Sequence, residues 1–244
     1  MITENQSKLM SRRAKPPARD AGATHNLSGQ RLGRKGQGTR ERIMKAMLVL
    51  LEGDNPAPVT LSAIAREANI GMSTLYLYFP DLGDLLLAVL RRVMDEQEAA
   101  FLHCLRTRWP DDMLFEQSRA FVRAHFEFWQ RHAHLLQMRN AFADARDPRL
   151  VEYRAATSAP LISLLVEQMD VRPDNKDNEY FDCAVVLLTG LERVATVLTN
   201  PDVAEYSQLT DDERRRAYID RLARAEARLI EIAIRDMRSQ AHSV

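Results

Sequence analysis

The sequence predicts an all-α fold, and three observations support this prediction. Glycine is absent between Gly83 and Gly190, although it interrupts the chain repeatedly outside this stretch. From Thr39 onward, apolar residues recur at spacings of three and four, which is the period of one helix face. The sequence shows neither the alternating pattern of a half-buried strand nor an internal repeat of about 20 to 50 residues.

The composition narrows the class of protein. The chain has 244 residues, of which 45% are hydrophobic and 28% charged, as expected for a globular protein of one large or two small domains. It has only two cysteines, Cys104 and Cys183, so a disulfide framework is excluded and a reducing compartment suits the chain. Its longest segments without charge, residues 68–80 and 155–166, are shorter than the roughly 18 residues that a membrane helix needs. We therefore expect a cytoplasmic protein without a membrane partner.

Residues 1–38 differ from the rest of the chain in composition. Lys and Arg contribute eight positive charges here against the two negative charges of Glu4 and Asp20, and apolar residues are scarce. Such a segment cannot bury enough apolar surface to fold, which predicts a disordered basic arm over residues 1–38. A basic arm favours a polyanionic partner, with nucleic acid before an acidic membrane; a solvated tail without function is the alternative.

The first part of the ordered chain reads as four helices. They are expected over residues 39–52, 60–68, 73–79 and 81–109. Gly53 and the turn over residues 54–58 end the first helix, and Thr60 is the expected N-cap of the second. Pro80 stops the third helix, and Asp81 caps the fourth.

Five further helices are expected beyond Pro110. They cover residues 112–131, 133–145, 148–169, 179–198 and 210 onward. Pro160 should kink or split the helix in which it lies. A polar linker is predicted over residues 170–178, and Thr210 with Glu213 fits a capping box at the start of the last helix.

Residues 64–78 have the layout of a helix-turn-helix, in which one short helix braces the next against the DNA major groove. The second short helix contains Thr74, Tyr76 and Tyr78, and these hydroxyl groups are suitable phosphate donors. Burial of both tyrosines in the core is the alternative.

The motif that carries the strongest resemblance runs from Val59–Ala65 through Ala68 to Thr74–Pro80 and the pair Leu85-Leu86. Over about residues 39–90 this pattern resembles the TetR family of one-component transcriptional regulators. The resemblance implies a three-helix DNA-binding head with a helix-turn-helix over residues 39–85. It also implies an α-helical effector-binding and dimerisation domain over residues 86–244.

The chain departs from the family pattern in two places. Around the turn the family commonly has glycine, serine, lysine and glycine, whereas this chain has Asn69, Gly71, Met72 and Ser73. The glycine has moved, and its function is expected to move with it. Leu82 stands where the family usually has a lysine, so one phosphate contact is missing.

The resemblance, together with the charge distribution, predicts how DNA is contacted. Residues 68–80 contain no Lys or Arg, which excludes the bidentate arginine-to-guanine contact from this helix. We therefore expect thymine methyl contacts from Met72 or Leu77, with charge supplied by the first helix and the arm. The predicted DNA-contacting residues are Arg40, Arg42, Lys45, Thr60, Gly71, Met72, Ser73, Thr74, Tyr76, Leu77 and Tyr78.

A ligand site is predicted in the middle of the chain, where aromatic and thioether side chains gather. The candidate lining residues are Phe121, His125, Phe126, Trp129, Met138, Arg139 and Phe142. They suit a flat or greasy effector whose acidic group meets His125 or Arg139, and ordinary core packing is the alternative.

The last two helices predict self-association. The helix over residues 179–198 is apolar on nearly every side and must be buried on several of them. Its Gly190 costs about 1 kcal/mol in helix propensity, which a close approach between backbones can offset. The candidate dimer contacts are Val186, Gly190, Val194, Leu222, Leu229 and Ile230. They fit a four-helix dimer interface, and burial within one subunit is the alternative.

Nothing in the sequence indicates catalysis. His125 and His132 share one helix face, but no carboxylate or cysteine lies at ligand spacing, so no metal site is predicted. No cofactor is predicted either, since glycine-rich phosphate loops and nucleophile elbows are absent.

These observations together predict a regulator with double-stranded DNA, a second copy of the chain and a small-molecule effector as partners. We expect a homodimeric repressor that binds a palindromic operator and is released by the effector. The alternative is an all-helical module that docks a protein or a membrane, with the basic arm as its anchor.

Overall fold

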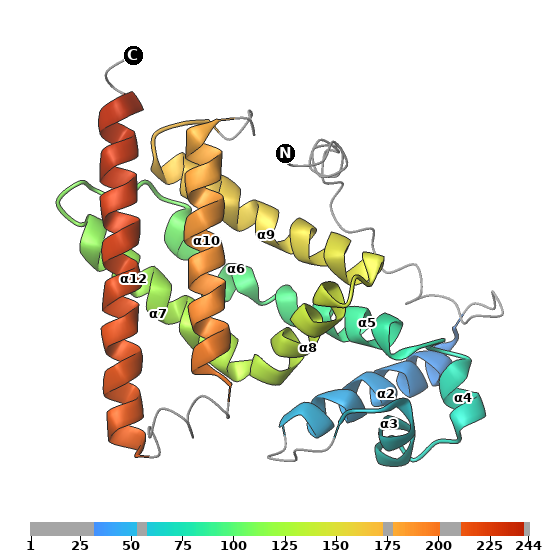
Figure 1. The fold of residues 1–244 in the computed structure, drawn as a ribbon. Coiled ribbons are helices and arrows are strands. Elements are labelled where there is room, and N and C mark those ends of the chain that lie inside the picture. The colour runs from blue at the N-terminus through green and yellow to red at the C-terminus, as the bar shows by residue number, and fades with distance from the viewer. Residues whose placement is uncertain (1–31, 53–57, 173–177, 201–210, 242–244) are drawn as a thin grey trace. The chain divides into compact units, whose positions relative to one another are not determined.

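The computed structural model describes residues 32–52, 58–172, 178–200 and 211–241, and all regular secondary structure in these ranges is helical (Figure 1). The elements are α2 (Arg34–Glu52), α3 (Leu61–Glu67), α4 (Met72–Tyr76), α5 (Leu82–Met94), α6 (Gln97–Ala100), the 3-10 helix η2 (Leu102–Leu105), α7 (Leu114–Arg131), α8 (Ala133–Asp144), α9 (Pro148–Gln168), α10 (Glu179–Leu198) and α12 (Asp212–Ala241). The predicted all-α class is confirmed. None of the helices described is both long enough and apolar enough to cross a membrane.

The chain divides into two compact units. The first contains the described residues up to Leu90 together with residues 139–159, and the second contains residues 91–138 and the described residues from Pro160 on. In the first unit, α2, α3, α4 and α5 surround a core of fully buried side chains. This core includes Ile43, Met47, Ile64, Leu75 and Leu85.

Helix α2 begins at Arg34, five residues before the predicted start, so the predicted disorder is wrong for residues 34–38. The cause lies in Leu32, which is buried against the first turn of the helix. A Cβ atom at Gly36 would come within 2.8 Å of the Leu32 side chain, so this glycine permits the close approach. The rest of the predicted arm, residues 1–31, lies outside the described residues.

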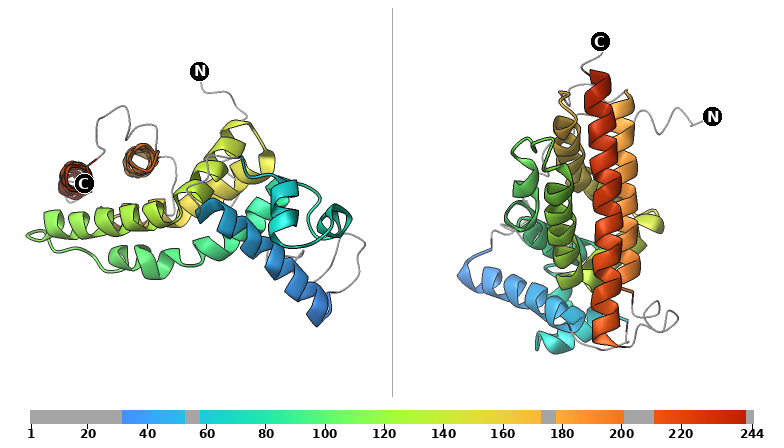
Figure 2. Two further views of the ribbon diagram at one scale, coloured as in Figure 1. Left: turned by 90° about the horizontal axis from the view of Figure 1, so that it is seen from below. Right: turned by 90° about the vertical axis from the view of Figure 1, so that its left-hand side faces the viewer.

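The second unit is built around aromatic side chains. Its α7 packs against α12 and α10, and α10 and α12 run side by side (Figures 1 and 2). The predicted helix over residues 81–109 is wrong beyond Met94, because α5 ends there and is followed by α6 and η2. The break between these two elements falls at Phe101, which is buried with its ring centroid 5.0 Å from that of His125 and 5.3 Å from that of Phe128. Phe101 has a non-helical backbone conformation, with φ −150° and ψ −24°, and an uninterrupted helix would point its ring elsewhere.

Other predicted boundaries agree closely or fall outside the described residues. Helix α9 continues through Pro160 and does not split there, and the two units divide at this residue. Residues 54–57 of the predicted turn, residues 173–177 of the predicted linker and the predicted cap Thr210 are not among the described residues. At the start of α12 the Asp211 carboxylate accepts a hydrogen bond from the amide of Glu213 at 2.9 Å.

Candidate nucleic-acid interface

The turn between α3 and α4 is fixed by local backbone geometry. The Thr60 side chain caps α3 by accepting a hydrogen bond from the Ala63 amide at 3.2 Å. The helix ends at Glu67. Asn69 follows with a left-handed φ of 51°, and the Ile70 amide then donates to the Ala65 carbonyl at 3.0 Å. Asparagine is one of the few residues that adopt this conformation without a large penalty.

Gly71 has a different role from the one that its residue type suggests. Its φ of −75° is available to any residue, and a Cβ atom there would meet only the Ser73 hydroxyl, at 3.8 Å. The left-handed position of the turn therefore belongs to Asn69. Gly71 instead leaves open space at the start of α4.

Helix α4 presents an outer face that carries hydroxyl and apolar groups. Leu75 and Phe79 are buried and anchor the segment to the core. Tyr76 and Leu77 are 46% and 47% exposed, and Ser73 is also exposed. Burial of Tyr76 in the core is therefore wrong, and its hydroxyl is available to a partner.

The remaining predicted contacts of α4 are half-buried. They are Met72, Thr74 and Tyr78. The Tyr78 hydroxyl lies beside Gly36, where a Cβ atom would come within 3.6 Å of it. The first turn of α2 thus backs the segment that follows α4.

The predicted cations of α2 separate into two groups. Arg42 and Lys45 are exposed, as is Thr60 at the start of α3. Arg40 is only 7% exposed; its guanidinium lies 5.0 Å from the Phe79 ring centroid, and its Nη1 donates to the Met44 sulfur at 3.1 Å. This burial does not fit the predicted phosphate contact of Arg40. The spacing of Arg40 and Met44 by four residues, on the apolar face of α2, is the signal that indicates it.

Comparison with known proteins agrees with this geometry. Residues 43–89, which run from α2 into α5, match the sequence model of the bacterial regulatory proteins of the tetR family. The match covers the head of the chain, and it supports a DNA-binding transcriptional regulator in which α3 and α4 form the helix-turn-helix. No curated protein matches the chain.

In the first unit an ionic cluster anchors the start of α5. The Arg149 guanidinium, from α9 in the same unit, donates to Asp81 at 3.0 Å, to Asp84 at 2.8 Å and to Asp147 at 2.7 Å. These hydrogen bonds lower the pKa of Asp147 below its ordinary value. A Cβ atom at Gly83 would lie 2.6 Å from Arg149 Nη2, so the glycine makes room for the guanidinium. Sequence reasoning missed this cluster because 68 residues separate Asp81 from Arg149.

Four of the predicted effector residues form a packed aromatic cluster, and one of these four, Phe126, also lines a small pocket. Phe121, Phe126 and Trp129 are buried around His125, with ring centroids 6.2 to 6.3 Å from that of the imidazole. This arrangement favours the core-packing alternative for these four. Of the others, Met138 is half-buried in the same unit, and Arg139 and Phe142 belong to the other unit. Arg139 is buried and donates to the Asn140 side chain at 3.0 Å.

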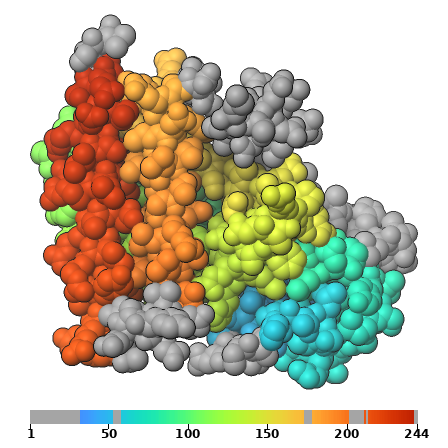
Figure 3. Space-filling model, viewed as in Figure 1, coloured from blue at the N-terminus to red at the C-terminus, as the bar shows by residue number. Residues whose placement is uncertain are grey.

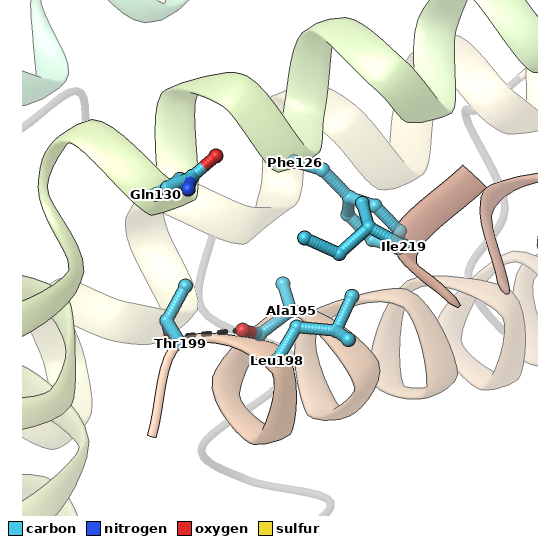
Figure 4. A pocket seen from close by; sticks show the side chains of 6 residues that line it. All are labelled: Phe126, Gln130, Ala195, Leu198, Thr199 and Ile219. Carbon is cyan, nitrogen blue, oxygen red and sulfur yellow. Dashed lines mark hydrogen bonds between the residues drawn. The ribbon is translucent and has the colours of Figure 1, made fainter. Parts of the chain in front are cut away.

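A small pocket lies among α7, α10 and the start of α12 in the second unit (Figure 4). It encloses about 250 Å³, part of which is open to solvent. The lining residues are Phe126, Gln130, Ala195, Leu198, Thr199 and Ile219. Sequence reasoning found Phe126 and missed the other five, which come from three helices and share no local pattern.

The two histidines considered for a metal site lie in unlike surroundings. His125 is buried among aromatic rings, whereas His132 is half-buried at the C-cap of α7, 3.6 Å from Glu96. Within the described part of the chain, no three His, Cys, Asp or Glu side chains are grouped so that they could hold a metal ion.

The predicted dimer residues divide between surface and core. Val186 on α10 and Leu229 on α12 are 70% and 57% exposed, and Ile232, which was not predicted, is 56% exposed. Gly190 has open space where a Cβ atom would stand. Ile230 is buried within the chain, which favours the alternative of ordinary core burial for this residue. Val194 and Leu222 are half-buried.

Proposed function

We propose that this TetR-family regulator is a homodimeric repressor that binds a palindromic operator and leaves it when a small-molecule effector binds. The observation that carries the proposal is the exposure of three apolar side chains, those of Val186, Leu229 and Ile232. These side chains are exposed on two neighbouring helices, α10 and α12, which lie side by side in Figure 3. Exposed apolar residues grouped in this way mark association surfaces. Two copies related by a two-fold axis present two recognition helices and require a palindromic site, with half-sites roughly 34 Å apart.

Each half of the dimer would contact DNA through two kinds of group. The exposed Arg42 and Lys45 provide charge for phosphates, while Ser73 and Tyr76 offer hydroxyl groups near the groove. Thr60, which already caps α3, would hold the first short helix against the backbone. These groups suit binding to double-stranded DNA. We place the protein in the cytoplasm as part of the same proposal.

The effector is proposed to be a small apolar or aromatic molecule. The pocket beside Phe126 is much smaller than most ligand sites. An effector that enlarges it, by separating α7 from α10 and α12, would bind one conformation of the regulator better than another. Such differential affinity is what release from DNA requires.

Selection of bound duplexes from a random DNA pool, repeated at two salt concentrations, tests the function. A palindromic winner whose binding falls steeply but incompletely with salt supports a dimeric, sequence-specific regulator. Binding that is uniform across sequences and vanishes with salt contradicts it. In that case a basic segment acts without sequence readout, and the alternative of a docking module gains support.

Substitutions in α2 give the first prediction for this interface. Arg42→Gln should weaken operator binding and reduce the slope of log K against log salt by about one per half-site, because one phosphate contact is lost. Arg40→Gln is the matched control on the same helix. Its guanidinium is buried over Phe79, so we expect a loss of thermal stability with an unchanged salt slope. The reverse pattern, with the slope change in Arg40→Gln, would show that the assignment of these two residues is wrong.

A further inference from the structure

The C-cap residue of α4, Leu77, is an apolar side chain with about half of its surface exposed. Leu75 and Phe79 are buried, and Leu77 lies between them with 47% of its surface exposed. Leu77 keeps a helical backbone, with φ −68° and ψ −22°, and its amide donates to the Thr74 carbonyl at 3.2 Å. Two residues after an inward-facing position, a helix has turned by about 200°, so the Leu77 side chain faces away from the core.

The chemistry of the major groove limits what such a side chain can recognise. Base edges there present hydrogen-bond donors and acceptors, and the one apolar group is the C5 methyl of thymine. Residues 68–80 contain no Lys or Arg, so guanine is not read by a cation from this segment. An exposed leucine on this helix thus has one favourable counterpart on B-form DNA.

We propose that Leu77 determines part of the operator sequence by contacting the C5 methyl of one thymine in each half-site. The inference rests on the proposed function, since it assumes that α4 enters the major groove of an operator. It also separates Leu77 from Met72, the other residue that was expected to contact a thymine methyl group. Met72 is half-buried in the first turn of α4, whereas Leu77 extends outward beside the exposed Tyr76.

Deoxyuridine provides the test, because it differs from thymidine by the absence of this methyl group alone. After the operator of the full chain has been selected, each thymine of one half-site and its symmetry mate is replaced in turn by deoxyuridine. One such pair should weaken binding by about fourfold per half-site, the effect of one apolar carbon removed from a buried contact. In Leu77→Ala the same replacement should have no effect. A duplex with cytosine at this position should bind the natural chain more weakly than a duplex with 5-methylcytosine. The Leu77→Ala variant should bind the two duplexes equally.

Two further variants serve as controls. Met72→Ala should keep the sensitivity to deoxyuridine, and so should Val49→Ala, which shortens an exposed apolar residue of α2. The thermal unfolding midpoint of Leu77→Ala should match that of the natural chain, because the side chain has little packing to lose.

The outcomes separate the inference from the function on which it rests. An operator that is selected normally but tolerates deoxyuridine at every thymine overturns the inference and leaves the proposed function standing. Equal sensitivity in Leu77→Ala, or loss of sensitivity in Met72→Ala alone, also overturns it. Failure to select any duplex overturns the proposed function, and the inference falls with it.

Discussion

Arg238 on α12 shows how much one buried side chain contributes within the second unit. Its guanidinium is 5% exposed and donates to the carbonyl oxygens of Gln168 at 2.7 Å and Trp109 at 3.0 Å, and to the Asp111 carboxylate. Arg238→Met would leave the two carbonyl groups without this donor. We expect the free energy of unfolding, measured by urea denaturation, to fall by about 3 kcal/mol.

Arg224 on the same helix is the matched control for this prediction. It pairs with Asp220 at 2.7 Å, but both side chains are about half exposed. Arg224→Met should therefore change the free energy of unfolding by less than about 0.5 kcal/mol. If both variants lost the same free energy of unfolding, the buried contacts of Arg238 would contribute nothing to stability, and the prediction would be wrong.

At the scale of single residues, the sequence predicts best where the cause is local. The cap at Thr60 and the buried Leu75 follow from patterns within a few positions. The burial of Arg40 depends on Phe79, and that of Arg238 on Gln168 and Trp109, which are distant in the chain. A charged residue type indicates exposure unless such a long-range partner is known.

At the scale of elements, the cluster around Arg149 joins the start of α5 to the start of α9. The stability that this cluster contributes should decrease at acidic pH. Its hydrogen bonds lower the pKa of Asp147. Burial raises the pKa of Asp81, but the hydrogen bonds from Arg149 and from two backbone amides outweigh it, and the net pKa is lowered. A carboxyl with a lowered pKa in the folded state contributes stability that is complete above its ordinary pKa of 3.8. That contribution disappears as the pH falls through the lowered value.

Arg149→Met should therefore lose less stability on acidification than the natural chain. The measurement is urea denaturation at about pH 7 and about pH 3, on either side of the ordinary carboxyl pKa. Arg154→Met is the control, because it removes an exposed pair with Asp144 in the same unit and leaves the cluster intact. The same acid-induced loss in Arg149→Met as in the control would contradict the role of this cluster.

The sequence predicts the existence of the helices better than their limits. Periodicity places α7, α8, α9 and α10 to within about two residues, because each has an apolar face of its own. It fails beyond Met94, where burial of Phe101 against α7 overrides the continuing helical pattern. It also fails at Gly36, where a residue with low helix propensity lies inside α2 because Leu32 packs against it.

For the whole molecule, the exposed apolar residues of α10 and α12 are the basis of the proposed dimer. It is unfavourable to expose the apolar side chains of Val186, Leu229 and Ile232 to water. Gly190 on α10 leaves open space where a Cβ atom would stand. In the proposed dimer, a second copy would cover these side chains and its backbone could approach closely at Gly190. The two helices of each copy would then form a four-helix interface.

Leu229→Glu should therefore convert the protein from a dimer to a monomer of 27.9 kDa, as measured by sedimentation equilibrium. Two buried carboxylates near the two-fold axis would repel each other and lose hydration. The variant should keep its thermal unfolding midpoint when that is measured at the concentration where the natural chain is also monomeric. Its operator affinity should fall steeply, because a single head retains only one half-site.

Met113→Glu, at an exposed apolar residue just before α7, is the control and should remain dimeric. A Leu229→Glu protein that stays dimeric would place the association surface elsewhere on the molecule.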